Sequence, residues 1–175
     1  MMTRVDACRV WHFRNARLYV YSGLFVGLNV FAVYAVHALG GSLWGKTWLP
    51  MHFFALVTGL AFGWRCGAIV GLATPLLSFG LSGMPVAASL PEIVLKTTAL
   101  GIASGLLAER RLLGNILFQA AAAVFAVQVV FGLAVSAFAG SFAAGFADLW
   151  RGYPGVAVQL AAGSLLALLL RRADG

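Results

Sequence analysis

Apolar residues run in long stretches along this chain, and short breaks rich in glycine, proline or charge separate them. The stretches cover residues 18–39, 50–64, 66–81, 91–107, 116–139 and 153–170. A helix that crosses a membrane needs about 20 mostly apolar residues, and the first stretch and the last three satisfy this length. The second and third stretches are shorter, which favours a tilted or partly re-entrant hairpin, joined at Arg65 and covered by its neighbours.

The pattern therefore predicts an all-α membrane protein, a six-transmembrane-helix bundle that forms one domain over residues 1–175. Composition agrees, because 62% of the residues are hydrophobic and only 10% are charged, whereas about a quarter are charged in a soluble domain. The breaks at residues 40–46, 82–85 and 140–152 are predicted to be loops.

The net charge of +7 is a topology signal rather than a sign of nucleic-acid binding. If the chain crosses the membrane six times, nine of its 12 basic residues fall on one side. Only Lys46, Lys96 and Arg151 remain for the other side. Basic residues accumulate on the cytoplasmic side of membrane proteins, so both termini are expected to be cytoplasmic.

No enzyme signature is present. The chain has no nucleophile elbow, no phosphate-binding glycine loop and no His-Glu-x-x-His motif. The two cysteines, Cys8 and Cys66, give neither a metal-ligand spacing nor an expected disulfide. We therefore expect a protein that is not an enzyme, holds no cofactor and lacks an ATP site of its own.

Glu92 and Lys96 form the most informative polar pair in the chain. They lie four residues apart within an apolar segment, which places them on one helix face in the favoured order. An ionisable residue inside a membrane usually marks a pathway or a binding site. The helix dipole accounts for Glu92 near a helix start but not for an ammonium one turn deeper. Two readings stay open: the pair contacts a substrate, or it only stabilises the helix.

His37 and His52 flank the first outer loop, at the face where Glu92 is expected. Imidazole and carboxylate together could bind a divalent metal, or the two histidines could hydrogen-bond to water and backbone. Gln159 is expected about two turns below the outer end of the last helix, where it either contacts a ligand or bonds another helix.

Trp44 and Trp48 also belong to the outer face. Such aromatics either form the belt that membrane helices present to the interface or close over a ligand, since binding pockets favour aromatic walls.

Glycines recur every four residues along several segments, a spacing that lets membrane helices approach closely. Packing within the chain is expected for one set: Gly59, Gly63, Gly67, Gly71, Gly101 and Gly105. Gly23 and Gly27 repeat the spacing in the first helix, where contact with another protein is the more plausible use.

The segment from Pro50 to Glu109 has a distinctive order of motifs. Leu49-Pro50-Met51-His52 precedes the glycines, and Thr74-Pro75-Leu76-Leu77-Ser78, Ser82-Gly83-Met84-Pro85 and Pro91-Glu92 follow. This order resembles the substrate-specificity subunit (S component) of energy-coupling-factor (ECF) vitamin transporters. The resemblance implies a six-helix bundle in a bacterial or archaeal plasma membrane. It also implies tight capture of a vitamin-like molecule from outside, with a membrane coupling protein and two ATPases as partners.

The resemblance also suggests roles for individual residues. Lys96 would meet an anionic or carbonyl group of the ligand and Glu92 a donor, while Met84 and Pro85 would supply a neighbouring wall. Trp44 and Trp48 would close the first loop over it. Gly23-x-x-x-Gly27 is the nearest match to the Ala-x-x-x-Ala patch that docks the coupling protein in that family. A membrane scaffold without a ligand, or metal uptake through the two histidines and Glu92, are the alternatives.

Overall fold

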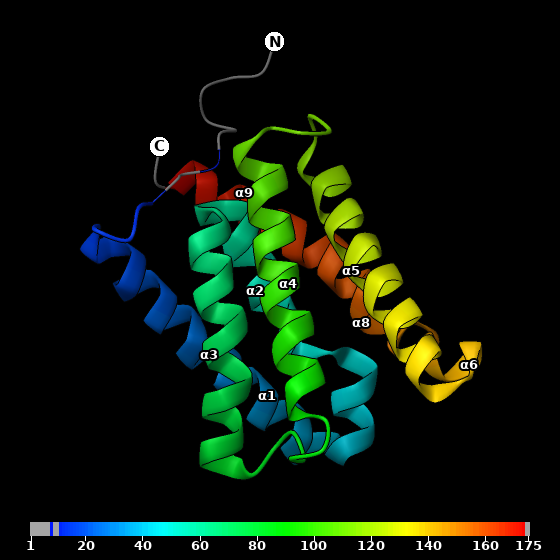
Figure 1. Cartoon of the computed structure of the whole chain (residues 1–175). Helices are drawn as coiled ribbons and strands as arrows, with labels where there is room; N and C mark the ends of the chain where they lie inside the picture. The colour runs from blue at the N-terminus through cyan, green and yellow to red at the C-terminus, as the bar shows by residue number, and fades with distance from the viewer. Residues whose placement is uncertain (1–7, 9–10, 174–175) are drawn as a thin grey trace.

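The computed structural model describes Cys8 and residues 11–173, and every regular element in that part of the chain is helical (Figure 1). The elements are α1 (Ala16–Trp48), α2 (Pro50–Phe62), α3 (Trp64–Ser82), α4 (Leu90–Glu109), α5 (Ile116–Ala139), α6 (Phe142–Gly145), α7 (Ala147–Arg151), α8 (Tyr153–Val158), η2 (Gln159–Gly163) and α9 (Ser164–Ala173). Among the described residues, five helices are long and apolar enough to cross a membrane: Ala16–Gly41, Trp64–Ser82, Leu90–Glu109, Ile116–Phe138 and Tyr153–Ala173. The chain is thus an all-helical, multi-pass membrane protein.

Helix α2 differs from the other predicted spans because it has only 13 residues. At a rise of about 1.5 Å per residue it is too short to cross a membrane by itself. Its residues from Ala55 to Phe62 are all buried, and α1, α3, α4 and α9 surround it. A short helix covered by its neighbours agrees with the prediction of a partly re-entrant hairpin as far as α2 is concerned. The other helix of that hairpin, α3, has 19 residues and is long enough to span a membrane.

The breaks around α2 lie elsewhere than the sequence pattern predicted. Residues 40–46 are not a loop, because α1 kinks at Gly41 (φ 64°, ψ −159°) and continues to Trp48. Leu49, in the left-handed region (φ 47°, ψ 49°), then separates α1 from α2. The boundary with α3 falls at Gly63 (φ 90°) and not at Arg65, since glycine adopts positive φ without steric cost.

The prediction of a loop at residues 140–152 is also wrong in detail. This segment folds into the short helices α6 and α7, which turn back at the far end of α5 (Figure 1). The last span is continuous from Tyr153 to Ala173, but one π-helical turn, η2, interrupts its α-helical geometry.

Helices α3 and α4 meet along a line of glycines that we call the glycine seam: Gly67 and Gly71 on α3, with Gly101 and Gly105 on α4. A Cβ added to Gly67 would lie 2.9 Å from Cα of Gly101, and a Cβ on Gly101 would meet Gly67 in the same way. Across the seam the hydroxyl of Thr97 donates to the carbonyl of Gly71 at 2.6 Å. Packing within the chain, as expected for these glycines, is confirmed.

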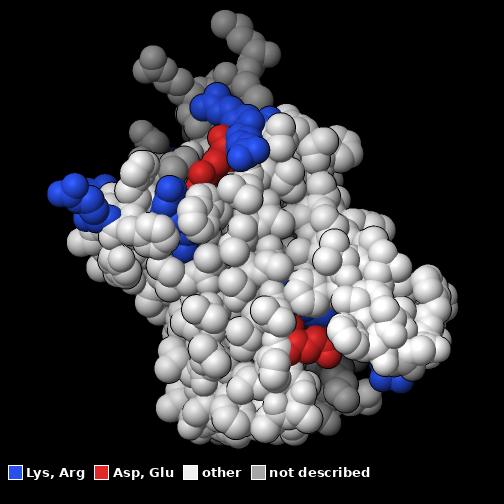
Figure 2. All heavy atoms as spheres, in the orientation of Figure 1, with Lys and Arg blue, Asp and Glu red and all other residues white. Residues whose placement is uncertain are grey.

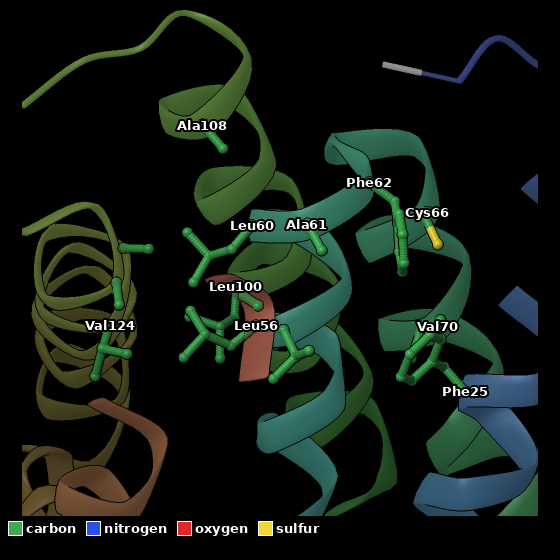
Figure 3. Close-up of a cluster of buried hydrophobic side chains, with 14 of the residues drawn as sticks. Phe25, Leu56, Leu60, Ala61, Phe62, Cys66, Val70, Leu100, Ala108 and Val124 are labelled. Carbon is green, nitrogen blue, oxygen red and sulfur yellow. The ribbon is translucent and has the colours of Figure 1, made fainter. Parts of the chain in front are cut away.

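The apolar core lies around α2 and extends to α5 (Figure 3). Leu56, Leu60 and Phe62 of α2 are almost completely buried. At one end of this core the Trp11 ring stacks on Phe62, with 4.6 Å between ring centroids. The described start of the chain therefore packs against the end of α2.

Charged contacts gather at this same end, which we call the basic end. The Arg171 guanidinium donates to the carbonyl oxygen of Leu60 at 3.0 Å from Nε and 2.6 Å from Nη2. The Glu109 carboxylate accepts a hydrogen bond from the backbone N–H of Trp64 at 3.1 Å. At this position, the start of α3, its negative charge interacts favourably with the helix dipole. Figure 2 shows most of the visible Lys and Arg side chains at this end, above a largely uncharged body.

Candidate functional site

Away from the basic end, a cavity of about 350 Å³ opens between the end of α1, the start of α2, the segment before α4 and the first turns of α4. We call it the main cavity. Its lining residues are His37, Gly45, Leu49, Pro50, Met51, His52, Met84, Pro85, Val86, Ser89, Glu92, Ile93 and Lys96. Five of the predicted ligand residues, His37, His52, Met84, Glu92 and Lys96, therefore come together from three parts of the chain.

Lys96 and Glu92 form an ion pair at the edge of this cavity. The Lys96 Nζ lies 2.6 Å from Oε1 of Glu92, on the preceding turn of α4. Lys96 is only 4% exposed, whereas 43% of the Glu92 side chain is exposed. The pair offsets a buried ammonium with a carboxylate that still contacts solvent, so its two formal charges cancel beside the cavity. Figure 2 shows red and blue atoms together in the lower body, where the other charged atoms in view are a separate blue group at the lower right.

The two histidines enter the main cavity from different helices. Nδ1 of His37 lies 2.8 Å from the carbonyl oxygen of Val33, and because that oxygen can only accept, Nδ1 carries the hydrogen. Gly45 makes room for the ring, since an added Cβ would lie 2.6 Å from its Cε1. His52 belongs to the first turn of α2, where its N–H donates to the Leu49 carbonyl.

The metal alternative requires His37, His52 and Glu92 to form one ligand cluster. Within residues 8 and 11–173, no three His, Cys, Asp or Glu side chains are grouped so that they could hold a metal ion. The three residues line one cavity without forming such a group, and the metal alternative loses its geometric basis.

Sequence reasoning missed most of the apolar lining. Leu49, Pro50 and Met51 shape the cavity because the left-handed turn at Leu49 directs the chain from α1 into α2. The amide of Asn29 holds this turn, donating to the Met51 carbonyl at 3.1 Å and to Thr74 at 3.2 Å. The available signal was Pro50 at a predicted helix start, followed two residues later by His52.

A second, much smaller space lies beyond the ion pair, and we call it the recess. Its volume is about 10 Å³, and its lining consists of His52, Lys96, Leu100, Val124, Val127, Gln128 and Gln159. His52 and Lys96 line both spaces. Gln159 is 2% exposed, and its Nε2 has no hydrogen-bond partner. Gln159 thus lies behind Lys96 and not in the main cavity.

The π-helical turn η2 begins at Gln159. Such turns are rare and occur often at functional sites. Just before it, Gly155 of α8 lies against the backbone of Trp48, where an added Cβ would meet the Trp48 carbonyl carbon at 2.6 Å. This close approach holds the start of the last span beside the end of α1.

Trp44 and Trp48 do not line the main cavity. Trp44 covers Gly40 on its own helix, and the two indoles are 45% and 42% exposed. Both lie after the kink of α1 rather than on a mobile loop, and their exposure is typical of an interface belt.

Gly23 and Gly27 lie in the spans rather than near the main cavity. They belong to a shallow apolar groove of about 420 Å³ between α1 and α3, lined by Tyr19, Ser22, Gly23, Val26, Gly27, Val30, Ile69, Ala73, Leu77 and Leu81. A Cβ added at either glycine would meet nothing within 4 Å, so neither serves packing among the described residues. Their use in contact with another protein stays a prediction.

The two cysteines are not bonded to each other. Burial raises the pKa of the Cys8 thiol to about 12, although the nearby Arg171 guanidinium opposes this shift. The thiol of Cys66 lies 3.3 Å from the hydroxyl of Ser22, between α1 and α3. Cys8 is therefore protonated at neutral pH and a poor nucleophile.

Fold and site together define the class: a multi-pass membrane protein, helical in its described part, with an off-centre cavity whose mostly apolar wall carries a few polar groups. No family model, curated protein or solved structure matches the chain. The functional argument therefore depends on the geometry of the main cavity and the recess.

Proposed function

We propose that this protein is the substrate-binding S component of an ECF transporter, which captures a vitamin-like small molecule from outside and delivers it inward. The main cavity is the observation that carries the proposal. Its volume of about 350 Å³ lies in the usual range for small-molecule sites, about 300–1,000 Å³. Its composition also fits, because apolar residues predominate around a few polar groups.

The polar groups support binding rather than catalysis. Lys96 and Glu92 are ionisable residues within a candidate membrane span, where such residues usually mark a pathway or a binding site. Both members of the pair line the main cavity, which favours a ligand contact over a purely structural role.

The charge distribution supports the orientation in the membrane that the proposed function requires. If the basic end is cytoplasmic, as the positive-inside rule expects, the main cavity opens toward the outside of a bacterial or archaeal plasma membrane. The open groove at Gly23 and Gly27 is then available to a membrane coupling protein. Because the sequence has no ATP site, two ATPase subunits would supply the energy for release.

Ligand-dependent thermal stabilisation tests the proposal. Purified protein is heated with a panel of vitamins and their precursors, and a compound present at 100 times its Kd is expected to stabilise the folded state by about 2.7 kcal/mol. Lys96→Met should weaken the effect at least tenfold in Kd, because it removes the buried ammonium and keeps an unbranched side chain.

Arg110→Met is the matched control, because Arg110 is exposed just after α4 and lines neither space. It should bind as the wild type does. A panel without any stabilising compound would refute the transport role and favour the scaffold alternative. Unchanged binding by Lys96→Met would place the site elsewhere.

A further inference from the structure

We infer that the bound molecule places an uncharged oxygen acceptor, an amide or ring carbonyl, in the recess, where Nε2 of Gln159 donates to it. This inference rests on the proposed function and specifies the chemical class of the ligand. The main cavity would hold the body of the molecule, and the recess would hold a single polar group.

The unpartnered amide is the first support. Gln159 is almost completely buried, yet its Nε2 has no hydrogen-bond partner. A buried donor without a partner costs about 1–3 kcal/mol, and such groups are uncommon in folded proteins. A ligand atom that accepts from Nε2 would remove this cost on binding.

The dimensions of the recess are the second support. A volume of about 10 Å³ is close to the smallest space that holds one water molecule. One oxygen atom therefore fits, whereas a ring does not. Lys96 and His52 line both spaces, so the recess adjoins the main cavity at these two side chains, and the proposed group would reach Gln159 between them.

The charge balance distinguishes a carbonyl from a carboxylate. The Lys96 ammonium is already 2.6 Å from the Glu92 carboxylate. The rest of the recess is lined by the apolar Leu100, Val124 and Val127 together with His52 and the uncharged amides of Gln128 and Gln159. A carboxylate in the recess would have to displace Glu92 from Lys96 or share that ammonium with it, which brings two negative charges close together. A neutral carbonyl needs neither and still accepts the hydrogen bond.

Matched pairs of acids and amides test the inference: nicotinate with nicotinamide, biotin with biotinamide, and lipoate with lipoamide. Binding is measured by thermal shift and by titration of the wild type, Gln159→Met and Thr98→Val. Thr98→Val is the control, because it also deletes a buried polar atom without a partner but lines neither space. In the wild type we expect the amide of a binding pair to have a Kd about tenfold lower than the acid.

Gln159→Met should abolish this preference, weakening the amide about tenfold, while the ligand-free protein keeps its Tm or gains slightly. Thr98→Val should bind as the wild type does. Tighter binding of the acid, or unchanged binding by Gln159→Met, would overturn the inference and leave the proposed function standing. If no member of any pair stabilises the wild type and the wider vitamin panel also fails, the proposed function falls and this inference with it.

Discussion

The protein buries two cations in different ways. Arg171 and Lys96 have similarly low exposures, 6% and 4%. At the basic end, protein acceptors surround the Arg171 guanidinium: the Leu60 carbonyl twice, and Oε1 of Gln119 at 3.4 Å. The Lys96 ammonium has a half-exposed carboxylate at its side and lines both the main cavity and the recess.

Their positions relative to helix dipoles differ as well. Arg171 bonds a carbonyl in the last turn of α2, where the dipole favours a positive charge. Lys96 lies in the first half of α4, where the dipole offers no such help. A buried charge alone therefore does not indicate a ligand site. A charged side chain that lines both a cavity and a recess, as Lys96 does, is the better indicator.

The glycine seam supports both regions, and its disruption should give the largest effect. In Gly101→Ala the new methyl would lie 2.9 Å from Cα of Gly67. Backbone cannot move aside as a flexible side chain can, so a loss of about 3 kcal/mol or more is expected, together with loss of ligand binding. Unfolding of the variant and of the wild type in detergent measures this loss of stability.

Gly80→Ala is the matched control for the seam, because Gly80 also lies in α3 but its added methyl would meet nothing within 4 Å. It should leave stability unchanged or raise it slightly. Equal stability of the two variants would show that α3 and α4 are farther apart than described here.

Arg171→Met should distinguish the role of Arg171 from that of Lys96. It leaves the Leu60 carbonyl and the Gln119 amide without a charged donor, so the free energy of unfolding should fall by about 2 kcal/mol. Affinity for any ligand of the main cavity should stay within about twofold. Lys96→Met should show the reverse, a smaller loss of stability and a large loss of affinity, because Glu92 can turn to solvent.

Both variants are compared by chemical unfolding and by ligand titration on the same preparations. Loss of binding in Arg171→Met at temperatures where it remains folded would contradict the division between a structural and a functional cation.

Much of this arrangement could be predicted from the sequence, for identifiable reasons. Long apolar stretches have few alternatives to membrane helices, and the four-residue glycine spacing correctly indicated packing within the chain, although not that α3 would meet α4. Glu92 and Lys96 were conspicuous because charge is rare in an apolar segment. Their distance in space followed directly from helix periodicity.

Other features depended on contacts that the linear pattern does not contain. The helix α1 continues past a kink at Gly41 where the glycines predicted a loop, and Gly45 in this part of the helix lies against the His37 ring. Trp44 and Trp48 therefore lie on α1 rather than over the cavity. The recess could not be foreseen either, because it requires α4, α5 and the π-helical turn to meet at Gln159.

An experimental structure of the wild type with the compound that gives the largest thermal shift would test the central claim most directly. Density for the compound is expected in the main cavity between Met84 and Lys96, with one uncharged oxygen within hydrogen-bond distance of Gln159 Nε2. A compound bound on another surface, with the main cavity empty or filled by lipid, would contradict the account.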